Sequence, residues 1–227
     1  MRILVVGCPG AGKSTFAASL ARATGLPLRH LDDEYWGAGW SRPDQQWWLE
    51  HQTRLTGGEH WIIDGNYLPT MQLRVPRADL VVLVDAATST CLVRVLRRAW
   101  RIRRGDPAAL PERVRAQAES GTPVPATKAF LPLLAMILRF RRRDWWRVVD
   151  VATAQPGTTL LAAVVGGPLG TRLAGVRRRL SGRAPSATVC PLPTAAQVIR
   201  ELIGDDGATS GRAADAQVHE LQGGNRP

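Results

Sequence analysis

The residue pattern with the clearest chemistry lies near the start of the chain. Residues 7–14 read Gly-Cys-Pro-Gly-Ala-Gly-Lys-Ser and match the pattern G-x-x-x-x-G-K-[ST]. Glycines at these positions let the backbone wrap closely around phosphates, so that successive N–H groups donate to phosphate oxygens. We expect Lys13 to reach the β- and γ-phosphates of ATP and Ser14 to bind Mg²⁺. The predicted nucleotide contacts are Gly7, Pro9, Gly10, Ala11, Gly12, Lys13, Ser14 and Thr15.

The segments on either side of this loop fit a phosphate-binding role. Ile3–Val6 is a short apolar run of the kind that forms a buried parallel strand. Lys13–Ala23 has a helical pattern that ends at Gly25, with Pro27 just beyond. A phosphate loop joins a strand to a helix in this order. The alternative is an ordinary glycine turn before a helix, and the strand and helix around the motif disfavour it.

Two aspartates end predicted strands. Asp64 closes the run Trp61–Asp64, where a carboxylate can hold Mg²⁺ directly or through water. Its alternative is a cap or turn residue before Gly65. Asp85 ends Leu80–Asp85 but opens a loop, which favours an ordinary turn role for it.

A third acidic position follows the predicted strand Leu28–Leu31. Asp32 or Asp33 could accept a hydrogen bond or a proton from the hydroxyl of a phosphoryl acceptor, and the alternative is that both are surface turn residues. Nearby tryptophans could stack on a base or simply pack in the core. They are Trp36, Trp40, Trp47 and Trp48.

The order of these segments predicts the fold class. Strands alternate with helices, which indicates an α/β domain with a doubly wound parallel sheet whose ligands bind at the carboxyl ends of the strands. We expect a five-stranded sheet of the P-loop type with a mobile lid. Its strands would be Ile3–Val6, Leu28–Leu31, Trp61–Asp64, Leu80–Asp85 and Ala187–Cys190.

The positive charge of the chain is concentrated in one segment. The net charge is +11, and residues 94–147 contain 14 basic and 4 acidic residues. Within the amphipathic helix predicted over 88–104, arginines gather on one face and no acid occurs from Arg94 to Arg104. Such a stripe could be a solvated face or a nucleic-acid contact. We favour contact with a transferring phosphoryl group, because a guanidinium matches its equatorial oxygens.

Length and composition suggest one domain over residues 1–204. Within it we expect an acceptor region over about 32–63, a lid over about 101–140 and an insertion of unassigned role over about 157–186, followed by a disordered tail at 205–227. No signal-peptide pattern or bilayer-length apolar run is found, so a cytoplasmic protein without membrane contact is expected.

Of the three cysteines, Cys8 is expected to be the most reactive, because the loop dipoles and Lys13 would lower its pKa.

These segments together resemble adenylate-kinase-related P-loop kinases, and most closely the DNA topology modulation proteins. Beyond the phosphate loop, the similarity includes His30-Leu31-Asp32 followed by Trp36, residues 61–67 (WIIDGNY), residues 91–96 (CLVRVL) and the arginine-rich 139–143. The resemblance implies a magnesium-associated role for Asp64. It also implies that arginines before and after the lid close on the phosphoryl group, which indicates Arg94, Arg98, Arg139 and Arg142.

One departure from this pattern concerns the acceptor. Adenylate kinases carry an arginine shortly after D-G, whereas this chain has Leu68 and Pro69, so phosphate gripping would be lost or moved to Arg74. A nucleotide-like and a hydroxyl acceptor therefore both remain open.

Three functions fit the sequence. The first is an ATP- and Mg²⁺-dependent kinase for a small molecule, with Lys13, Asp32 and Asp64 in its catalytic set and a monomer as the favoured state. The second is a P-loop ATPase without an acceptor. The third is a nucleic-acid-binding regulator, which the arginine-rich segment would suit.

Overall fold

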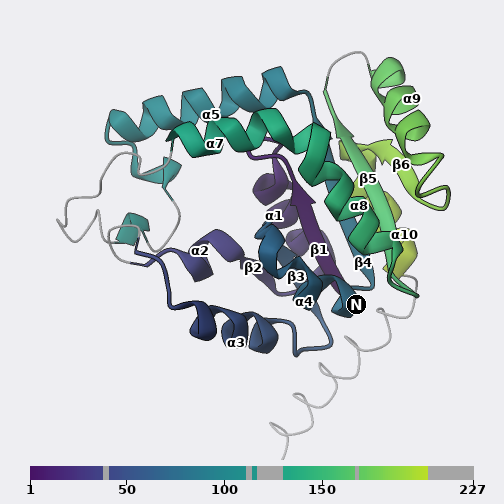
Figure 1. The fold of residues 1–227 in the computed structure, drawn as a ribbon, viewed down its shortest axis with the longest axis horizontal. Coiled ribbons are helices and arrows are strands. Elements are labelled where there is room, and N and C mark those ends of the chain that lie inside the picture. Colours follow the sequence, from purple (N-terminus) through teal and green to yellow (C-terminus); the bar gives the residue numbers. More distant parts are fainter. Residues whose placement is uncertain (38–40, 111–113, 117–129, 167–168, 204–227) are drawn as a thin grey trace, which may run out of the picture.

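A computed structural model describes residues 1–37, 41–110, 114–116, 130–166 and 169–203. Its centre is a parallel sheet with the strand order β2-β3-β1-β4-β5-β6 (Figure 1). The strands are β1 (Arg2–Gly7), β2 (Leu28–His30), β3 (Trp61–Asp64), β4 (Leu80–Ala86), β5 (Thr159–Val165) and β6 (Thr188–Pro191).

The central strands are buried because helices cover both faces of the sheet. Every residue of β4 is buried, and so is all of β1 except Arg2. On one face α1 (Lys13–Thr24) packs against α10 (Leu192–Ile203). On the other face α8 (Trp145–Thr153) lies beside α9 (Leu169–Leu180), where Arg179 stacks over the ring of Trp145 at 4.3 Å. This arrangement is the doubly wound architecture that alternating strands and helices predict.

The remaining helices lie around the carboxyl edge of the sheet and along its β2 side. They are α2 (Leu31–Tyr35), α3 (Gln45–Leu55), α4 (Met71–Arg74), α5 (Thr88–Arg103) and α7 (Phe130–Arg139). Short 3-10 turns cover Leu68–Thr70, Val75–Arg77 and Pro107–Ala109, and a π-helical turn, Phe140–Asp144, joins α7 to α8. No helix in the described ranges is long and apolar enough to cross a bilayer.

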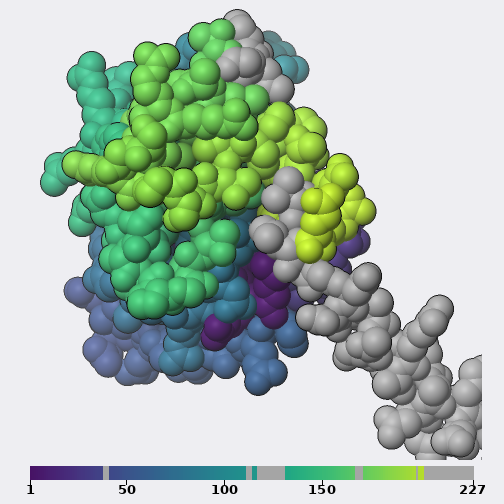
Figure 2. Space-filling view, turned by 90° about the vertical axis from the view of Figure 1, so that its right-hand side faces the viewer, coloured from purple at the N-terminus to yellow at the C-terminus, as the bar shows by residue number. Residues whose placement is uncertain are grey.

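The prediction of five strands is wrong, because the sheet has six. The additional strand, β5, lies in the segment 157–186 that the sequence suggested was an insertion, and it pairs with β4 and with β6. Five consecutive residues of β5, Leu160–Val164, are buried, so this apolar run belongs to the core. Figure 2 shows that the chain from α8 to α10, coloured green to yellow, forms a large part of one side of the molecule.

The lid prediction can be compared with the structure only at its two ends. Residues 111–113 and 117–129 lie outside the described ranges, and so does the tail predicted at 205–227. At the start of this segment, Ala109 and Leu110 are buried, as is Val114 further along. At its end, α7 contacts α5, and the two helices run side by side in Figure 1.

Candidate active site

The phosphate loop lies between β1 and α1 and needs glycine at two of its turns. Gly10 has φ 81° and Gly12 has φ 99°, both in the left-handed region. A Cβ on Gly10 would lie 2.6 Å from the carbonyl oxygen of Cys91 on α5. Gly10 is therefore required both by its own conformation and by the close approach of α5.

Three polar side chains lie where the loop ends and α1 begins. Lys13 is partly exposed, and its Nζ donates to the carbonyl oxygen of Cys8 at 3.3 Å within the loop. Ser14 and Thr15 are exposed in the first turn of α1. The N-terminus of a helix provides free N–H groups and a favourable dipole for an anion. This arrangement fits the predicted contacts of Lys13, Ser14 and Thr15 with a polyphosphate.

Asn66 fixes the start of the phosphate loop, and sequence reasoning gave it no such role. Its Oδ1 accepts from the Gly7 N–H at 3.0 Å, and its Nδ2 donates to the Gly7 carbonyl at 2.8 Å. The segment after β3 is therefore hydrogen-bonded to the end of β1. The sequence alone could not reveal this role, because the partner of Asn66 is 59 residues away along the chain.

Asp64 lies at the carboxyl end of β3 with a polar atom that lacks a partner. It is 4% exposed, and its Oδ2 lies 2.9 Å from Nδ1 of His30 on β2. The hydrogen bond to Asp64 raises the pKa of His30, although burial opposes this. The other oxygen, Oδ1, is buried and has no hydrogen-bond partner among the described residues. A buried carboxylate oxygen without a donor fits a cation or a cation-bound water.

The described residues contain no cluster of three or more His, Cys, Asp and Glu side chains that could by themselves hold a metal. Mg²⁺ does not need one, because it usually retains waters and binds through one or two protein oxygens together with nucleotide phosphates. Ser14 and Asp64 fit this mode of binding.

Asp32 lies at the start of α2 beside a group of aromatic rings. It is exposed, and Oη of Tyr67 donates to its Oδ1 at 3.0 Å. The ring of Tyr67 lies 4.7 Å from that of Tyr35 and 5.3 Å from that of Trp48, between ring centroids. Tyr67 adopts φ 34°, the one positive φ at a non-glycine residue in the described ranges. Such a conformation costs energy and is typical of functional sites.

The tryptophans near Asp32 have different environments. Trp48 is buried and packs edge-on to Tyr35 at 5.0 Å, so it belongs to the core. Trp36 also contacts Tyr35, at 4.9 Å, and is partly exposed. Trp47 is 41% exposed and stacks on His51. Trp40 lies outside the described residues.

Among the predicted arginines, Arg94 reaches the phosphate loop. Its Nη1 lies 3.3 Å from the Gly10 carbonyl and 3.2 Å from that of Ala11. Arg98 instead donates to the carbonyl of Ala109 at 2.8 Å, beyond the end of α5. The structure thus brings one of these two arginines into contact with the loop.

The arginines after the predicted lid are arranged differently from the expectation. Arg139 pairs with the buried Asp144 at 3.3 Å, and Arg142 is exposed with no hydrogen bond to any described residue. Their neighbour Arg141 points to the carboxyl edge of β4, where it lies 3.2 Å from Oδ2 of Asp85.

Asp85 is a buried ion-pair partner, so the interpretation of it as an ordinary turn residue is wrong. It belongs to β4, is 2% exposed, and binds both Arg141 and Arg172, the latter at 3.1 Å. Burial raises the pKa of Asp85, and the two guanidinium groups oppose that rise. Arg172 was missed because it lies in α9, within the supposed insertion.

Arg74 is not placed to grip an acceptor phosphate, contrary to one alternative from the sequence. It is completely buried, and burial lowers its pKa to about 10. Its guanidinium donates to Gln52, to Thr70 and to the Asn66 and Tyr67 carbonyls. Arg74 therefore supports the Asn66–Tyr67 turn from beneath.

The expectation for Cys8 was also wrong. Cys8 is 3% exposed, and a hydrogen bond with Cys91 together with burial raises the pKa of its thiol. A buried thiol with a raised pKa reacts slowly, because the thiolate is the nucleophile.

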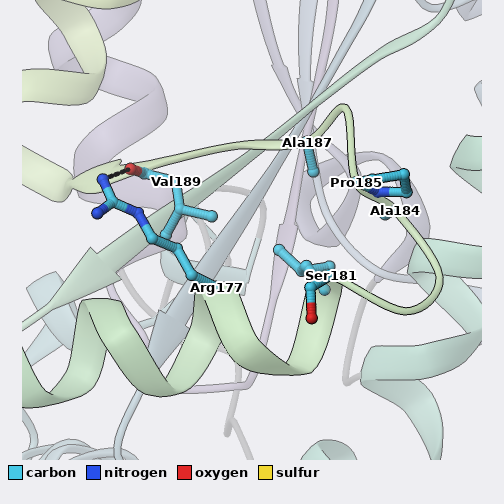
Figure 3. Close-up of a pocket in the computed structure, with 7 residues that line it drawn as sticks. Arg177, Ser181, Ala184, Pro185, Ala187 and Val189 are labelled. Atoms are coloured by element: carbon cyan, nitrogen blue, oxygen red, sulfur yellow. Dashed lines mark hydrogen bonds between the residues drawn. The ribbon is translucent and has the colours of Figure 1, made fainter.

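A pocket of about 320 Å³ lies away from this region, between α9 and the edge strand β6 (Figure 3). Arg177 lies at one end of it and donates to the carbonyl of Val189 at 3.4 Å. Its lining is otherwise mainly small and apolar: Leu180, Ser181, Ala184, Pro185, Ala187 and Val189. Strands β4 and β5 separate β6 from β1 and the phosphate loop.

Comparison with known proteins identifies no family for this chain. No family model matches the chain, and no curated protein matches it. The resemblance to DNA topology modulation proteins therefore stays a prediction.

Solved structures with a similar arrangement are small-molecule kinases. Shikimate kinase from Acinetobacter baumannii, in complex with shikimate, is 16% identical over 80% of this chain and 94% of that one, with a TM-score of 0.43. Shikimate kinase from Aquifex aeolicus is 20% identical over 64% of this chain and 99% of that one, with a TM-score of 0.33. Deoxyadenosine kinase from M. mycoides, with bound dATP, is 14% identical over 80% of this chain and 100% of that one, with a TM-score of 0.32. The chain itself is an α/β protein with a parallel six-stranded sheet, and a loop with the pattern G-x-x-x-x-G-K-[ST] joins β1 to α1.

Proposed function

We propose that this chain is a P-loop phosphotransferase that moves the γ-phosphoryl group of ATP to a hydroxyl of a small acceptor. The observation that carries this proposal is the meeting of three features at one edge of the sheet. The phosphate loop follows β1, the half-partnered carboxylate of Asp64 ends β3, and Asp32 follows β2. In parallel α/β sheets, ligands bind at this edge.

The phosphate loop would hold ATP through its backbone N–H groups, with Lys13 on the β- and γ-phosphates. Lys13 Nζ donates to the carbonyl oxygen of Cys8, and rotation of this flexible side chain would bring Nζ to the phosphates. Thr15 would add a hydroxyl donor from the first turn of α1.

Magnesium would be held by the Ser14 hydroxyl and, directly or through water, by Asp64. When bound, Mg²⁺ neutralises charge on the β- and γ-phosphates. His30 donates to the far oxygen of Asp64 and so orients the carboxylate toward the loop. Metal-binding groups are commonly oriented by such hydrogen bonds.

Asp32 would accept the proton of the acceptor hydroxyl. The hydroxyl oxygen would then attack the γ-phosphorus of ATP, and the bond between the γ-phosphorus and the oxygen of the β-phosphate would break to release ADP. Tyr67 donates to one oxygen of Asp32, which fixes the carboxylate and leaves its second oxygen for the acceptor. Arg94 would turn from the carbonyls of Gly10 and Ala11 to the charge on the phosphoryl group. Arg98 and Arg139 bind the Ala109 carbonyl and Asp144 and not the loop, so they, and Arg142 with them, would act only after movement of the lid.

The acceptor region favours a hydroxyl compound over a nucleoside monophosphate. The arginine available beneath this region, Arg74, is buried and engaged with neutral partners. What the region offers instead is a carboxylate at Asp32 and aromatic surface from Tyr67 and Trp36. Aromatic faces suit a ring or an apolar face, and a carboxylate repels a phosphate.

A coupled assay of ADP formation with Mg²⁺-ATP tests the proposal. Neutral polyols and nucleosides are compared with nucleoside monophosphates and with no acceptor, and the products are identified by mass spectrometry. We expect acceptor-dependent turnover that Lys13→Ala abolishes and Asp32→Asn lowers by roughly 100-fold or more. Turnover that no acceptor stimulates would favour the ATPase alternative, and a phosphorylated monophosphate as the product would reject the hydroxyl acceptor.

A further inference from the structure

Exposed apolar side chains are concentrated on the neighbouring helices α5 and α7. Six large apolar residues are exposed in the described part of the chain, and five of them lie on these two helices. They are Val93, Leu96 and Trp100 on α5, exposed by 63%, 49% and 53%, and Leu131 and Leu138 on α7, exposed by 76% and 59%. Grouped exposure of this kind marks an interaction surface.

The α5 part of this surface has a defined arrangement. At about 100° per residue, Val93, Leu96 and Trp100 fall within about 60° of one another on the helix. Arg97 and Arg104 continue the same face on one side, and Arg103 borders it on the other. All three arginines are exposed, and the Arg104 guanidinium lies 3.8 Å from the Trp100 ring centroid.

Along α5 itself, the charge beside the apolar stripe is of one sign. No acidic residue occurs between Arg94 and Arg104, and the nearest acid in the following turn, Asp106, is paired with Arg101 at 2.6 Å. The side chain of Trp100 combines an apolar ring with an N–H group, as suits the boundary between lipid and water. The surface therefore offers apolar side chains for burial and guanidinium groups for anions beside them.

From this combination we infer that the α5–α7 face is a docking surface for an anionic lipid bilayer. Apolar side chains of such a helix enter the boundary between headgroups and acyl chains, and the flanking arginines contact lipid phosphates. Docking at a surface requires no spanning helix, and the inference is independent of the proposed phosphoryl transfer. It differs from the expectation from the sequence that the protein makes no membrane contact.

Two other occupants fit the surface less well. Duplex DNA would pair with the arginines through its phosphates, but it offers no apolar medium for Val93, Leu96 and Trp100. A second copy placed symmetrically would bring each arginine-rich face against the same face of its partner, and like charges at an interface are unfavourable. A bilayer with anionic headgroups satisfies both the apolar and the charged part of the surface.

The test is cosedimentation of the full chain with two kinds of vesicle, one of phosphatidylcholine alone and one that also contains phosphatidylglycerol. We expect binding to the anionic vesicles that weakens as salt is raised. The double variant Arg97→Glu/Arg104→Glu should weaken it by about tenfold or more, because each basic residue near an anionic surface contributes roughly fivefold. Leu96→Ser/Trp100→Ser should also weaken it by about tenfold.

Matched controls come from the same chain. Trp47→Ser removes an exposed tryptophan from α3, and Arg178→Glu reverses an exposed charge on α9. Both should bind vesicles as the unaltered protein does, and thermal melting should show that all variants are folded. The inference is overturned if the protein does not bind anionic vesicles, or if the controls lose binding equally.

Two further measurements distinguish a bilayer from duplex DNA and from a second copy of the chain as the partner of this surface. Duplex DNA is titrated at the same salt concentrations, and the molar mass in solution is measured by light scattering. If the unaltered protein and Leu96→Ser/Trp100→Ser bind duplex DNA equally tightly and neither binds vesicles, the surface is a nucleic-acid surface. A dimer that the same variant converts to a monomer, again without vesicle binding, would identify contact between copies.

Discussion

Asn66 binds both backbone polar groups of Gly7, at 3.0 Å through its Oδ1 and at 2.8 Å through its Nδ2. This pair of hydrogen bonds ties the turn after β3 to the first residue of the phosphate loop. The same turn is supported from below by Arg74, which donates to the carbonyls of Asn66 and Tyr67. The position of the loop relative to Asp64 is therefore set by this amide side chain together with the pairing of β1 and β3, in which Val5 lies opposite Asp64.

Replacing Asn66 should disturb both the loop and the stability of the domain. Asn66→Asp keeps the shape of the side chain but turns the donor to the Gly7 carbonyl into an acceptor, so that two oxygens face each other. We expect the free energy of unfolding to fall by about 1–3 kcal/mol and the stabilisation by Mg²⁺-ATP to weaken. Urea unfolding with and without nucleotide measures both effects. Gln46→Ala, which removes an exposed amide on α3, is the control and should change neither. An Asp variant with unchanged nucleotide stabilisation would show that Asn66 does not position the loop.

Asp64→Asn should raise the Mg²⁺ concentration required for half-maximal ADP formation. The substitution removes the negative charge with little change in volume, and the buried Oδ1 is the atom assigned to the metal or its water. A loss of roughly 10-fold or more in apparent magnesium affinity is expected. Asp79→Asn serves as the control, because Asp79 pairs with Arg2 at the opposite, amino end of the sheet. Identical magnesium titrations for Asp64→Asn and the unaltered protein would reject the assignment.

The His30–Asp64 pair should make stability depend on pH in a defined direction. The pKa of His30 is raised above 6.5 in the folded protein, mainly by its hydrogen bond to Asp64. Protonated His30 thus favours the folded state, so its contribution is complete below 6.5 and is lost as pH rises through the raised pKa. The stability difference between the unaltered protein and His30→Gln should therefore shrink as pH rises from 5 to 9, values chosen to bracket an ordinary histidine pKa by roughly two units. Urea unfolding across this range measures the difference. A gap that stays constant or widens with pH would contradict the pairing.

Arg94 and Arg97 offer a matched pair on one helix. Arg94 reaches the carbonyls of the phosphate loop, whereas Arg97 is exposed on the surface of α5. Arg94→Lys retains the charge but loses the forked geometry, so turnover should fall by roughly 10- to 1,000-fold with a much smaller change in ATP affinity. Arg97→Lys should leave turnover within about twofold. Steady-state kinetics and nucleotide binding distinguish the two. Equal, small losses at both positions would remove Arg94 from the proposed site.

The features that the sequence determined are local ones. The phosphate loop, the strand before it and the helix after it were predicted because fixed spacing of Gly10, Gly12 and Lys13 decides their geometry within a few residues. Helix α5 and strands β1, β3 and β4 followed from hydrophobic periodicity and run length in the same way. The position of Asp64 at the carboxyl edge was a consequence of the parallel order of strands.

The features that only the tertiary structure decided depend on partners far apart in the chain. Strand β5 was missed because a short apolar run beside glycines has no periodicity that separates a core strand from an insertion, and only its pairing with β4 and β6 resolves this. The sequence could not show that Arg141 and Arg172 are the ion-pair partners of Asp85, because they lie 56 and 87 residues away along the chain. Burial likewise decides that Arg74 is structural and that Cys8 is unreactive, because exposure is a property of the packed molecule. The sequence thus determines the chemistry that can occur at the loop, and the packing determines which side chains are free to take part in it.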